Sequence, residues 1–205
     1  MTDEPAAEPS REPTPEPTLE PTPGGTGAPE AHRAVTVRRL HPTDAESCVD
    51  ALADVLIDCV EGGASVGFMR PLPRARALAF WHGVAAGVGR GERALLVAAD
   101  GAGRVVGTVQ LLLSMPDNQL HRADVAKMLV HRSARRRGIA ARLLAAAESA
   151  ARAEGRSVLV LDTVTGGDAE RLYARHGWQR VGSIPRYALL PEGAECGTTL
   201  FYKHL

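Results

Sequence analysis

The sequence predicts one α/β (α+β) domain, a mixed sheet with helices on its faces, behind an N-terminal tail. Residues 34–205 alternate between segments with the period of strands and segments with the period of helices. Two of the strands are joined by a Gly-containing turn that is typical of an antiparallel hairpin. With 205 residues, 44% of them hydrophobic, the chain is long enough for one sizeable core and short for two full domains.

The tail, residues 1–33, is dominated over its first 30 residues by Pro, Glu and Thr. Leu19 is the one large aliphatic side chain among those 30 residues. Such a segment cannot bury enough apolar surface to offset the entropy lost on ordering, so we expect it to be disordered and partly polyproline-like. A ligand for a proline-recognition domain is the functional alternative. The folded domain is expected to span residues 34–205.

The first half of this domain predicts a strand followed by two helices. Ala34–Leu40 alternates apolar and polar residues as a short strand does. Thr43 and Glu46 have the spacing of a capping box in front of the amphipathic run Ala45–Val60, and the glycines that follow should end this helix. Arg74–Ala86 is expected to form the second helix.

The second half predicts five more strand segments and two more helices. A hairpin should come first, with its turn at Asp100-Gly101-Ala102-Gly103. A strand, a helix, a strand and a helix should follow as a β-α-β-α unit, and two strands should close the chain. In order, the expected segments are Arg93–Ala99, Val105–Leu113, Asp124–Val130, Ile139–Ala153, Val158–Asp162, Asp168–Arg175, Trp178–Ile184 and Thr198–Lys203.

Bulk composition argues against several classes of function. Lys+Arg and Asp+Glu each number 24, so no basic excess points to nucleic acid as a partner. No apolar run approaches the length of about 20 residues that spans a bilayer, and the first 30 residues do not have the pattern of a signal peptide. Three cysteines without CxxC spacing favour reduced thiols and no metal site. We therefore expect a cytoplasmic protein without a membrane partner.

The segment Arg135–Ala140, Arg-Arg-Arg-Gly-Ile-Ala, predicts a phosphate-binding loop. It lies between a predicted strand and an Ala-rich helix, so exposed backbone N–H groups and the positive end of a helix dipole would face the same ligand. Gly138 lets a phosphate approach the backbone, and the arginines, Arg135, Arg136 and Arg137, can add charge-assisted contacts. The alternative is a solvated basic turn that caps an amphipathic helix.

This segment resembles the signature R/Q-x-x-G-x-G/A of the GNAT superfamily of N-acyltransferases, with Arg135, Gly138 and Ala140 in the matching positions. The resemblance continues over roughly residues 35–205. It implies a three-layer fold whose mixed, mostly antiparallel sheet has about six to seven strands, flanked by about four helices. It also implies acetyl-CoA as co-substrate and no metal. In this family the strand before the loop holds the pantetheine arm through backbone atoms. By resemblance, the cofactor site would therefore include the strand residues Met128, Leu129 and Val130, and also Ile139 of the phosphate loop.

The same resemblance implies a catalytic acid and suggests a base. Ala169, Leu172, Tyr173, Gly177 and Trp178 match the pattern A-x-x-L-Y-x-x-x-G-F, whose Tyr hydroxyl points at the sulfur and would protonate the leaving thiolate. A buried structural Tyr is the alternative reading of Tyr173.

A carboxylate is also needed, because an alkylamine with a pKa of about 10 is roughly 0.1% neutral at pH 7. Asp124, at the start of the strand that leads to the loop, is the first choice for this base, with a turn-capping role as its alternative. Asp162, at the end of the next parallel strand, is the competing carboxylate.

One position departs from the family pattern. The Asn that commonly precedes this Tyr by seven residues, and that contacts the pantetheine, is replaced by Gly166. Thr163 or Thr165 would then supply the polar contact, and we include Thr163 among the expected cofactor-binding residues.

The acceptor is the least determined part of the prediction. Specificity should come from the loops at residues 60–78 and 185–197, where Glu61, Glu192 and Glu195 could recognise a cation. A narrower resemblance to tabtoxin-resistance acetyltransferases, carried by KMLVHRSARRRGIA and AERLYARHGW, implies a small amine, amino-acid-like or antimicrobial. The alternatives are a protein lysine or N-terminal acetyltransferase, and a non-catalytic acyl-CoA sensor. An exposed last strand would favour a homodimer.

Overall fold

The computed structural model describes residues 1–2 and 35–205, so the prediction for the tail lies outside the described residues. Within them, seven strands form one sheet in the order β1-β2-β3-β4-β5-β7-β6. The strands are β1 (Thr36–Arg39), β2 (Arg93–Ala99), β3 (Val105–Leu112), β4 (Arg122–Val130), β5 (Val158–Val164), β6 (Gln179–Leu189) and β7 (Glu195–His204).

The sheet is antiparallel except where β4 meets β5. All other neighbouring strands among the described residues pair antiparallel, and the β4–β5 pair is joined through helix α4 (Ile139–Ala153). A parallel pair requires such a crossover, whereas β2 and β3 need only their tight turn. The predicted mixed, mostly antiparallel sheet of six to seven strands is confirmed.

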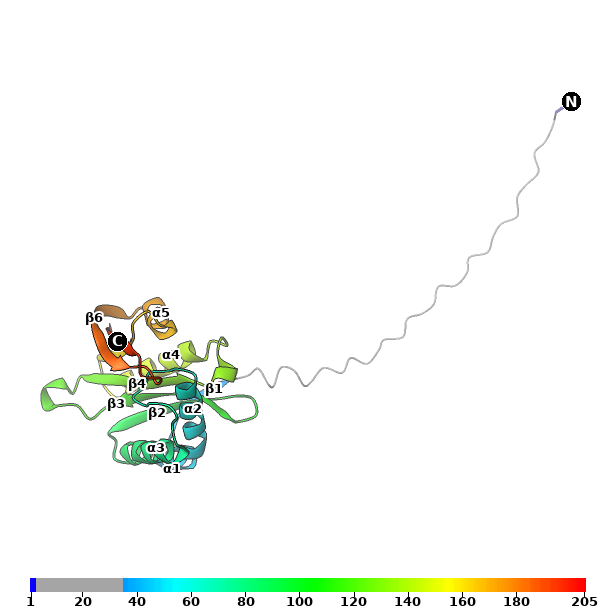
Figure 1. The fold of residues 1–205 in the computed structure, drawn as a ribbon. Helices are drawn as coiled ribbons and strands as arrows, with labels where there is room; N and C mark the ends of the chain where they lie inside the picture. Colours follow the sequence, from blue (N-terminus) through cyan, green and yellow to red (C-terminus); the bar gives the residue numbers. More distant parts are fainter. Residues whose placement is uncertain (3–34) are drawn as a thin grey trace.

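Helices cover both faces of the sheet and make a three-layer structure (Figure 1). The helices α1 (Pro42–Ser47), α2 (Val49–Glu61) and α3 (Arg74–Gly89) lie on one face, and α4 and α5 (Asp168–Arg175) lie on the other. Two 3₁₀ turns, Asp117–Gln119 and Arg132–Ala134, flank β4. Each face has its own apolar core, because sheet side chains alternate between faces. The α1–α3 core centres on Leu52, Leu56, Trp81 and Leu95, and the α4 core on Leu111, Leu143, Leu159 and Phe201.

The first helical segment differs from the prediction. The run Ala45–Val60 is two helices that meet at Cys48, and the capping box is wrong. The N-cap of α1 is His41, whose side chain makes no capping hydrogen bond, and Thr43 already lies inside the helix. Pro42 explains the earlier start, because its fixed φ is suited to the first helical turn.

The last strands extend beyond their predicted bounds. β7 runs from Glu195 to His204 because it pairs with β5 on one side and β6 on the other. β6 continues through Pro185 to Leu189, with an irregular register between Ile184 and Ala188. A proline is tolerated there because β6 is an edge strand. By contrast, α4 and α5 have the predicted bounds.

A buried carboxylate joins α4 to the C-terminal strand. Glu148 accepts hydrogen bonds from Lys203 Nζ at 2.8 Å and from the Trp178 indole at 3.1 Å. Lys203 Nζ also donates to the carbonyl of His176, the C-cap of α5, at 2.9 Å. These contacts fix the C-terminal end of α5 against the sheet.

Candidate active site

A cavity of about 1140 Å³ opens where β4 and β5 separate. The two strands pair only from Arg122↔Val158 to Asp124↔Val160, whereas β5 stays paired with β7 along its whole length. Beyond Asp124, the backbone of β4 therefore pairs with no described strand on its β5 side. Met128, Leu129 and Val130 line the cavity there, as the resemblance implies.

The phosphate loop and the N-terminus of α4 form one end of this cavity. Gly138 is the N-cap of α4, with φ +72°, and no side chain within residues 35–205 caps the helix. Gly138, Ile139, Ala140 and Ala141 all line the cavity, so the first N–H groups of a 15-residue helix are directed toward it without a side-chain partner. Arg136 also has a positive φ of +63°, which makes the loop a second backbone concavity suited to an anion. These features fit the diphosphate of a CoA ester.

Four arginines line the cavity, and two of them were not predicted. Arg135 and Arg136 come from the loop, and Arg171 and Arg175 come from α5. Arg137 is not among the lining residues. The charges of Arg136 and Arg135 help to hold the pKa of Asp168 below its usual value, after the larger effect of a hydrogen bond from Arg171. Their spacing of four residues on α5 was a signal that could have identified Arg171 and Arg175 as one helical face.

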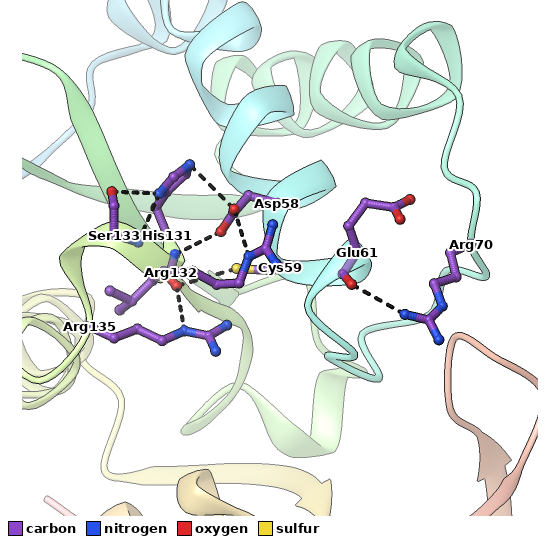
Figure 2. Close-up of polar contacts among 9 residues, drawn as sticks. Asp58, Cys59, Glu61, Arg70, His131, Arg132, Ser133 and Arg135 are labelled. Atoms are coloured by element: carbon purple, nitrogen blue, oxygen red, sulfur yellow. Dashed lines mark hydrogen bonds and ion pairs between the residues drawn. The ribbon is translucent and has the colours of Figure 1, made fainter.

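Asp58 of α2 anchors the chain that enters the loop (Figure 2). Its carboxylate accepts hydrogen bonds from the backbone N–H of Arg132 at 2.7 Å and from Arg132 Nε at 2.9 Å, and His131 Nε2 lies 3.5 Å away. Burial alone would raise the pKa of Asp58, but the bonds from Arg132 and the neighbouring charges hold it below its ordinary value. Sequence reasoning missed this contact because 74 residues separate its partners.

The last residue of β4 is also held from two sides. The carbonyl of Val130 accepts a hydrogen bond from Arg135 Nε at 3.2 Å and one from Cys59 Sγ at 3.4 Å (Figure 2). The two backbone groups of a strand residue point to the same side, so the N–H of Val130 also faces away from β3. Arg135 thus stabilises the loop through this hydrogen bond and also contributes a positive charge to it.

Tyr173 lines the same cavity from α5. Its side chain is 4% exposed, and its ring packs against Trp178 and Phe201 at centroid distances of 5.7 and 6.0 Å. No described residue forms a hydrogen bond with its hydroxyl. Burial, with a smaller effect from Asp162, raises the pKa of Tyr173 to about 12. The phenol is therefore neutral, and a hydrogen-bond donor, throughout the physiological range.

The two candidate carboxylates occupy different places. Asp162 lines the large cavity, and its Oδ2 lies 2.9 Å from the Thr198 hydroxyl. Asp124 lines a separate cavity of about 330 Å³ and lies 3.1 Å from Arg122 Nη1. Burial raises the pKa of Asp124, Arg122 acts against this rise, and the charge of Asp162 adds to it. The two carboxylates are thus close enough to interact, but only Asp162 lines the large cavity that Tyr173 and the phosphate loop also line.

The loop around Gly166 places only one of the two threonines in the cavity. Thr163 lines it, whereas Thr165, just after β5, has its Oγ1 2.9 Å from Thr199 Oγ1 of β7. Gly166 has φ +80°, a backbone conformation that few other residues adopt.

A second part of the cavity, called the acceptor end below, is lined by residues 62–67 and by residues of the β6–β7 segment, Tyr187, Ala188, Leu190, Cys196 and Gly197. None of the three glutamates considered as cation ligands lines it. Glu61 accepts from the N–H of Leu72, Glu192 lies 3.7 Å from Arg70, and Glu195 lies 3.8 Å from Arg186.

One cation at this end was not foreseen. Lys127 lines the cavity and has φ +51° at a β-bulge, where Lys127 and Met128 lie opposite the single residue Val109. Bulges depend on strand pairing, so no local sequence signal identified this one.

Among the described residues, no group of His, Cys, Asp and Glu side chains is arranged to hold a metal. In that same part of the chain, none of the helices has the length and apolar character needed to cross a membrane. The three cysteines are free thiols.

Comparison with known proteins agrees with this geometry. Residues 91–180 match the family model of the acetyltransferase (GNAT) domain. Among solved structures, a ribosomal-protein-alanine N-acetyltransferase from Brucella melitensis is 23% identical, with a TM-score of 0.70, and the match covers 83% of this chain and 99% of that one. A Salmonella typhimurium protein, yncA, solved with its cofactor acetyl-CoA, is 20% identical, with a TM-score of 0.69 and coverage of 84% and 94%.

A candidate phosphinothricin N-acetyltransferase is 18% identical, with a TM-score of 0.68 and coverage of 84% and 99%. At these identities the structural likeness establishes the fold, and the family match covers the hairpin, β4, the phosphate loop, α4, β5 and α5. Residues 91–180 therefore match the acetyltransferase (GNAT) domain, and the described residues 35–205 have the fold of these solved acetyltransferases.

Proposed function

We propose that this protein transfers the acetyl group of acetyl-CoA to a primary amine of a small molecule by direct attack of the amine. The observation that carries the proposal is one continuous cavity. It is lined by the uncapped N-terminus of α4, by Tyr173 and Asp162, and by the Gly-rich Gly62–Gly67 loop. The neighbour described as a candidate phosphinothricin N-acetyltransferase supports a small acceptor.

Acetyl-CoA supplies the acetyl group as a thioester when it is bound. Its diphosphate would be held by the N–H groups of residues 138–141, with charge from Arg135 and Arg136. Arg171 would add charge from α5. Backbone groups of Met128, Leu129 and Val130, which have no β5 neighbour, would hold the arm, with Thr163 as an additional polar contact. Arg137 does not line the cavity, so it could attract the phosphates only through longer-range electrostatics.

Tyr173 is proposed as the acid. Its neutral hydroxyl can donate a hydrogen bond, and then its proton, as negative charge develops on the departing sulfur. The absence of a bond from any described residue to this hydroxyl supports the role, because a purely structural buried Tyr usually has a partner.

A carboxylate is proposed to accept the proton of the amine, directly or through water. The geometry favours Asp162, which lines the cavity, as the group that faces the amine. Asp124 would then act from behind it, through its electrostatic interaction with Asp162.

The test measures CoA thiol released from acetyl-CoA with a panel of small amines and of peptides, using the wild type, Asp162→Asn and Asp124→Asn. We expect turnover with small amines, and a larger loss of kcat/KM in Asp162→Asn than in Asp124→Asn. Turnover with peptides alone would indicate a protein acetyltransferase, the activity named for the Brucella neighbour. Tight CoA binding without turnover would indicate a sensor module.

Location and assembly are part of the same proposal. Three free thiols support the cytoplasm, a reducing compartment. The last strand, β7, is paired on both sides and is not the exposed edge that was expected. The edge strand β6 supports a homodimer instead, because it carries the exposed apolar residues Val181, Ile184, Tyr187 and Leu189. Light scattering of the purified protein would report the oligomeric state.

A further inference from the structure

Lys127 is a cation inside the acceptor end of the cavity. It lies on the bulge of β4, and its ammonium is 5.5 Å from the centre of the Phe80 ring on α3. The position of a Cβ on Gly67 would be 4.0 Å from Lys127 Nζ, so the ammonium also approaches the Gly-rich loop. The side chain thus extends over the α1–α3 face, away from the phosphate loop.

This ammonium has no carboxylate partner within residues 35–205. It lies over the ring of Phe80, but this contact is not a hydrogen bond and leaves its three N–H donors unsatisfied. Burial and the nearby Arg93 lower the pKa of Lys127, and Asp162 acts in the opposite direction. Asp162 is therefore close enough to influence Lys127, yet the two do not form an ion pair. A cation and an anion therefore line the same cavity without forming an ion pair with each other.

A ligand with both charges would satisfy both side chains. A carboxylate near Lys127 would gain charge-assisted hydrogen bonds, and the amine of the same molecule could donate to Asp162. The ammonium of Lys127 also disfavours a second positive charge nearby, so it would lower the pKa of the bound amine and increase its neutral, nucleophilic fraction. An acceptor with only a positive charge would lose the first effect and meet repulsion.

We propose that Lys127 binds an acidic group of the acceptor, so that the substrate class is an amine with a carboxylate a few bonds away, as in an amino acid. This inference rests on the proposed function and names its substrate class. Lys127 is a specificity-determining residue in this scheme, and it takes no part in binding acetyl-CoA.

The experiment compares α-amino acids with their primary amides, which differ in the carboxylate alone. The amine of an amide is the less basic of the two, so its neutral fraction is larger at neutral pH and ionisation of the amine favours the amide. The kcat/KM of each pair is measured by thiol release for the wild type, Lys127→Met and Lys127→Arg. Arg76→Met is the matched control, because Arg76 lies over Phe68, in the same aromatic cluster, but does not line the cavity.

We expect the wild type and Arg76→Met to prefer the acid about 10- to 100-fold, the ratio that one charge-assisted contact provides. Lys127→Met should lose this preference, because only the acid loses a charge-assisted contact and its kcat/KM therefore falls more than that of the amide. Lys127→Arg should keep part of the preference. Equal turnover of acid and amide by the wild type would overturn the inference, as would an equal loss of both in Lys127→Met.

A binding measurement separates this inference from the proposed function. Thermal shift in the presence of CoA reports whether acids bind better than amides, and whether the difference depends on Lys127. If no amine is turned over but acids still bind in a Lys127-dependent way, the proposed function fails and the inference stands. If acids and amides shift the melting temperature equally, the inference fails whatever the turnover. The melting temperature of unliganded Lys127→Met shows that the variant is folded.

Discussion

Replacing Tyr173 by Phe separates a catalytic hydroxyl from a structural ring. The ring contacts with Trp178 and Phe201 are kept in Phe, and no described residue loses a hydrogen bond. Removing a buried hydroxyl without a partner relieves its desolvation, so the free energy of unfolding should fall by less than about 0.5 kcal/mol or rise slightly. A structural Tyr with a bonded hydroxyl would instead cost about 1 kcal/mol or more.

The catalytic loss should be much larger. The pKa of Tyr173 is about 12, against an ordinary 10.0, which corresponds to about 3 kcal/mol of preference for the neutral phenol. Surroundings that disfavour a phenolate keep the hydroxyl protonated, so it is available as a donor to a developing thiolate. Loss of one preorganised donor at such a site lowers kcat about 10²- to 10³-fold, or about 3–4 kcal/mol.

The assay is steady-state thiol release with the best amine, together with chemical denaturation of both proteins. The KM for acetyl-CoA should change little, because the diphosphate contacts are elsewhere. Tyr202→Phe is the control, since that hydroxyl bonds Gln179 on β6, outside the cavity lining. Undiminished kcat in Tyr173→Phe between pH 6 and pH 9, approximate limits that bracket the operating range, would refute the assignment. So would a fall in kcat that the loss of stability fully explains.

Two further predictions concern the phosphate loop. Gly138→Ala should cost about 1 kcal/mol of stability because of the positive φ, and nothing more, since an added Cβ would have no atom within 4 Å. Gly138→Glu should in addition abolish CoA binding, measured by calorimetry. Equal CoA affinities of the two variants would contradict the assignment of this loop to the phosphates. Asp58→Asn should destabilise the protein by about 1–2 kcal/mol at pH 7 and raise the KM for acetyl-CoA. Asp54→Asn is the control, because Asp54 lies one turn earlier on α2 and forms only an exposed ion pair, and this variant should change neither the stability nor the KM. The pKa of Asp58 in the folded protein lies below its ordinary value of 3.8, so the stability that Asp58 contributes is present above pH 3.8 and is lost as the pH falls through the folded pKa. The denaturation curves of the wild type and Asp58→Asn should therefore approach each other at roughly pH 3. Curves that stay as far apart as at pH 7 would contradict this prediction.

Features that depend on neighbouring residues along the chain were predictable. The bounds of α4 and α5 agree with the helical periodicity, and the hairpin agrees with its Asp-Gly turn. The phosphate loop is of the same kind, because a strand end, Gly138 and the first turn of α4 are consecutive in the chain. A glycine with positive φ before a helix is a local property, so six residues sufficed to predict the backbone geometry of this loop.

Features that depend on distant segments required the tertiary structure. The cavity exists because β4 and β5 stop pairing after Asp124, and the bulge at Lys127 depends on how β4 pairs with β3. The choice between Asp124 and Asp162 as the base also depends on the tertiary structure. Both aspartates lie in strands, and the strand pattern of the sequence does not distinguish them, whereas the folded structure places them in separate cavities.

The anchor from Asp58 to Arg132 likewise joins residues 74 positions apart. Hydrogen bonds and charges act over a few ångströms in space, whatever the separation along the chain. The sequence alone therefore predicted the loop that we propose for the phosphates of CoA, whereas only the folded arrangement brings Lys127, Asp162 and Tyr173 around one cavity.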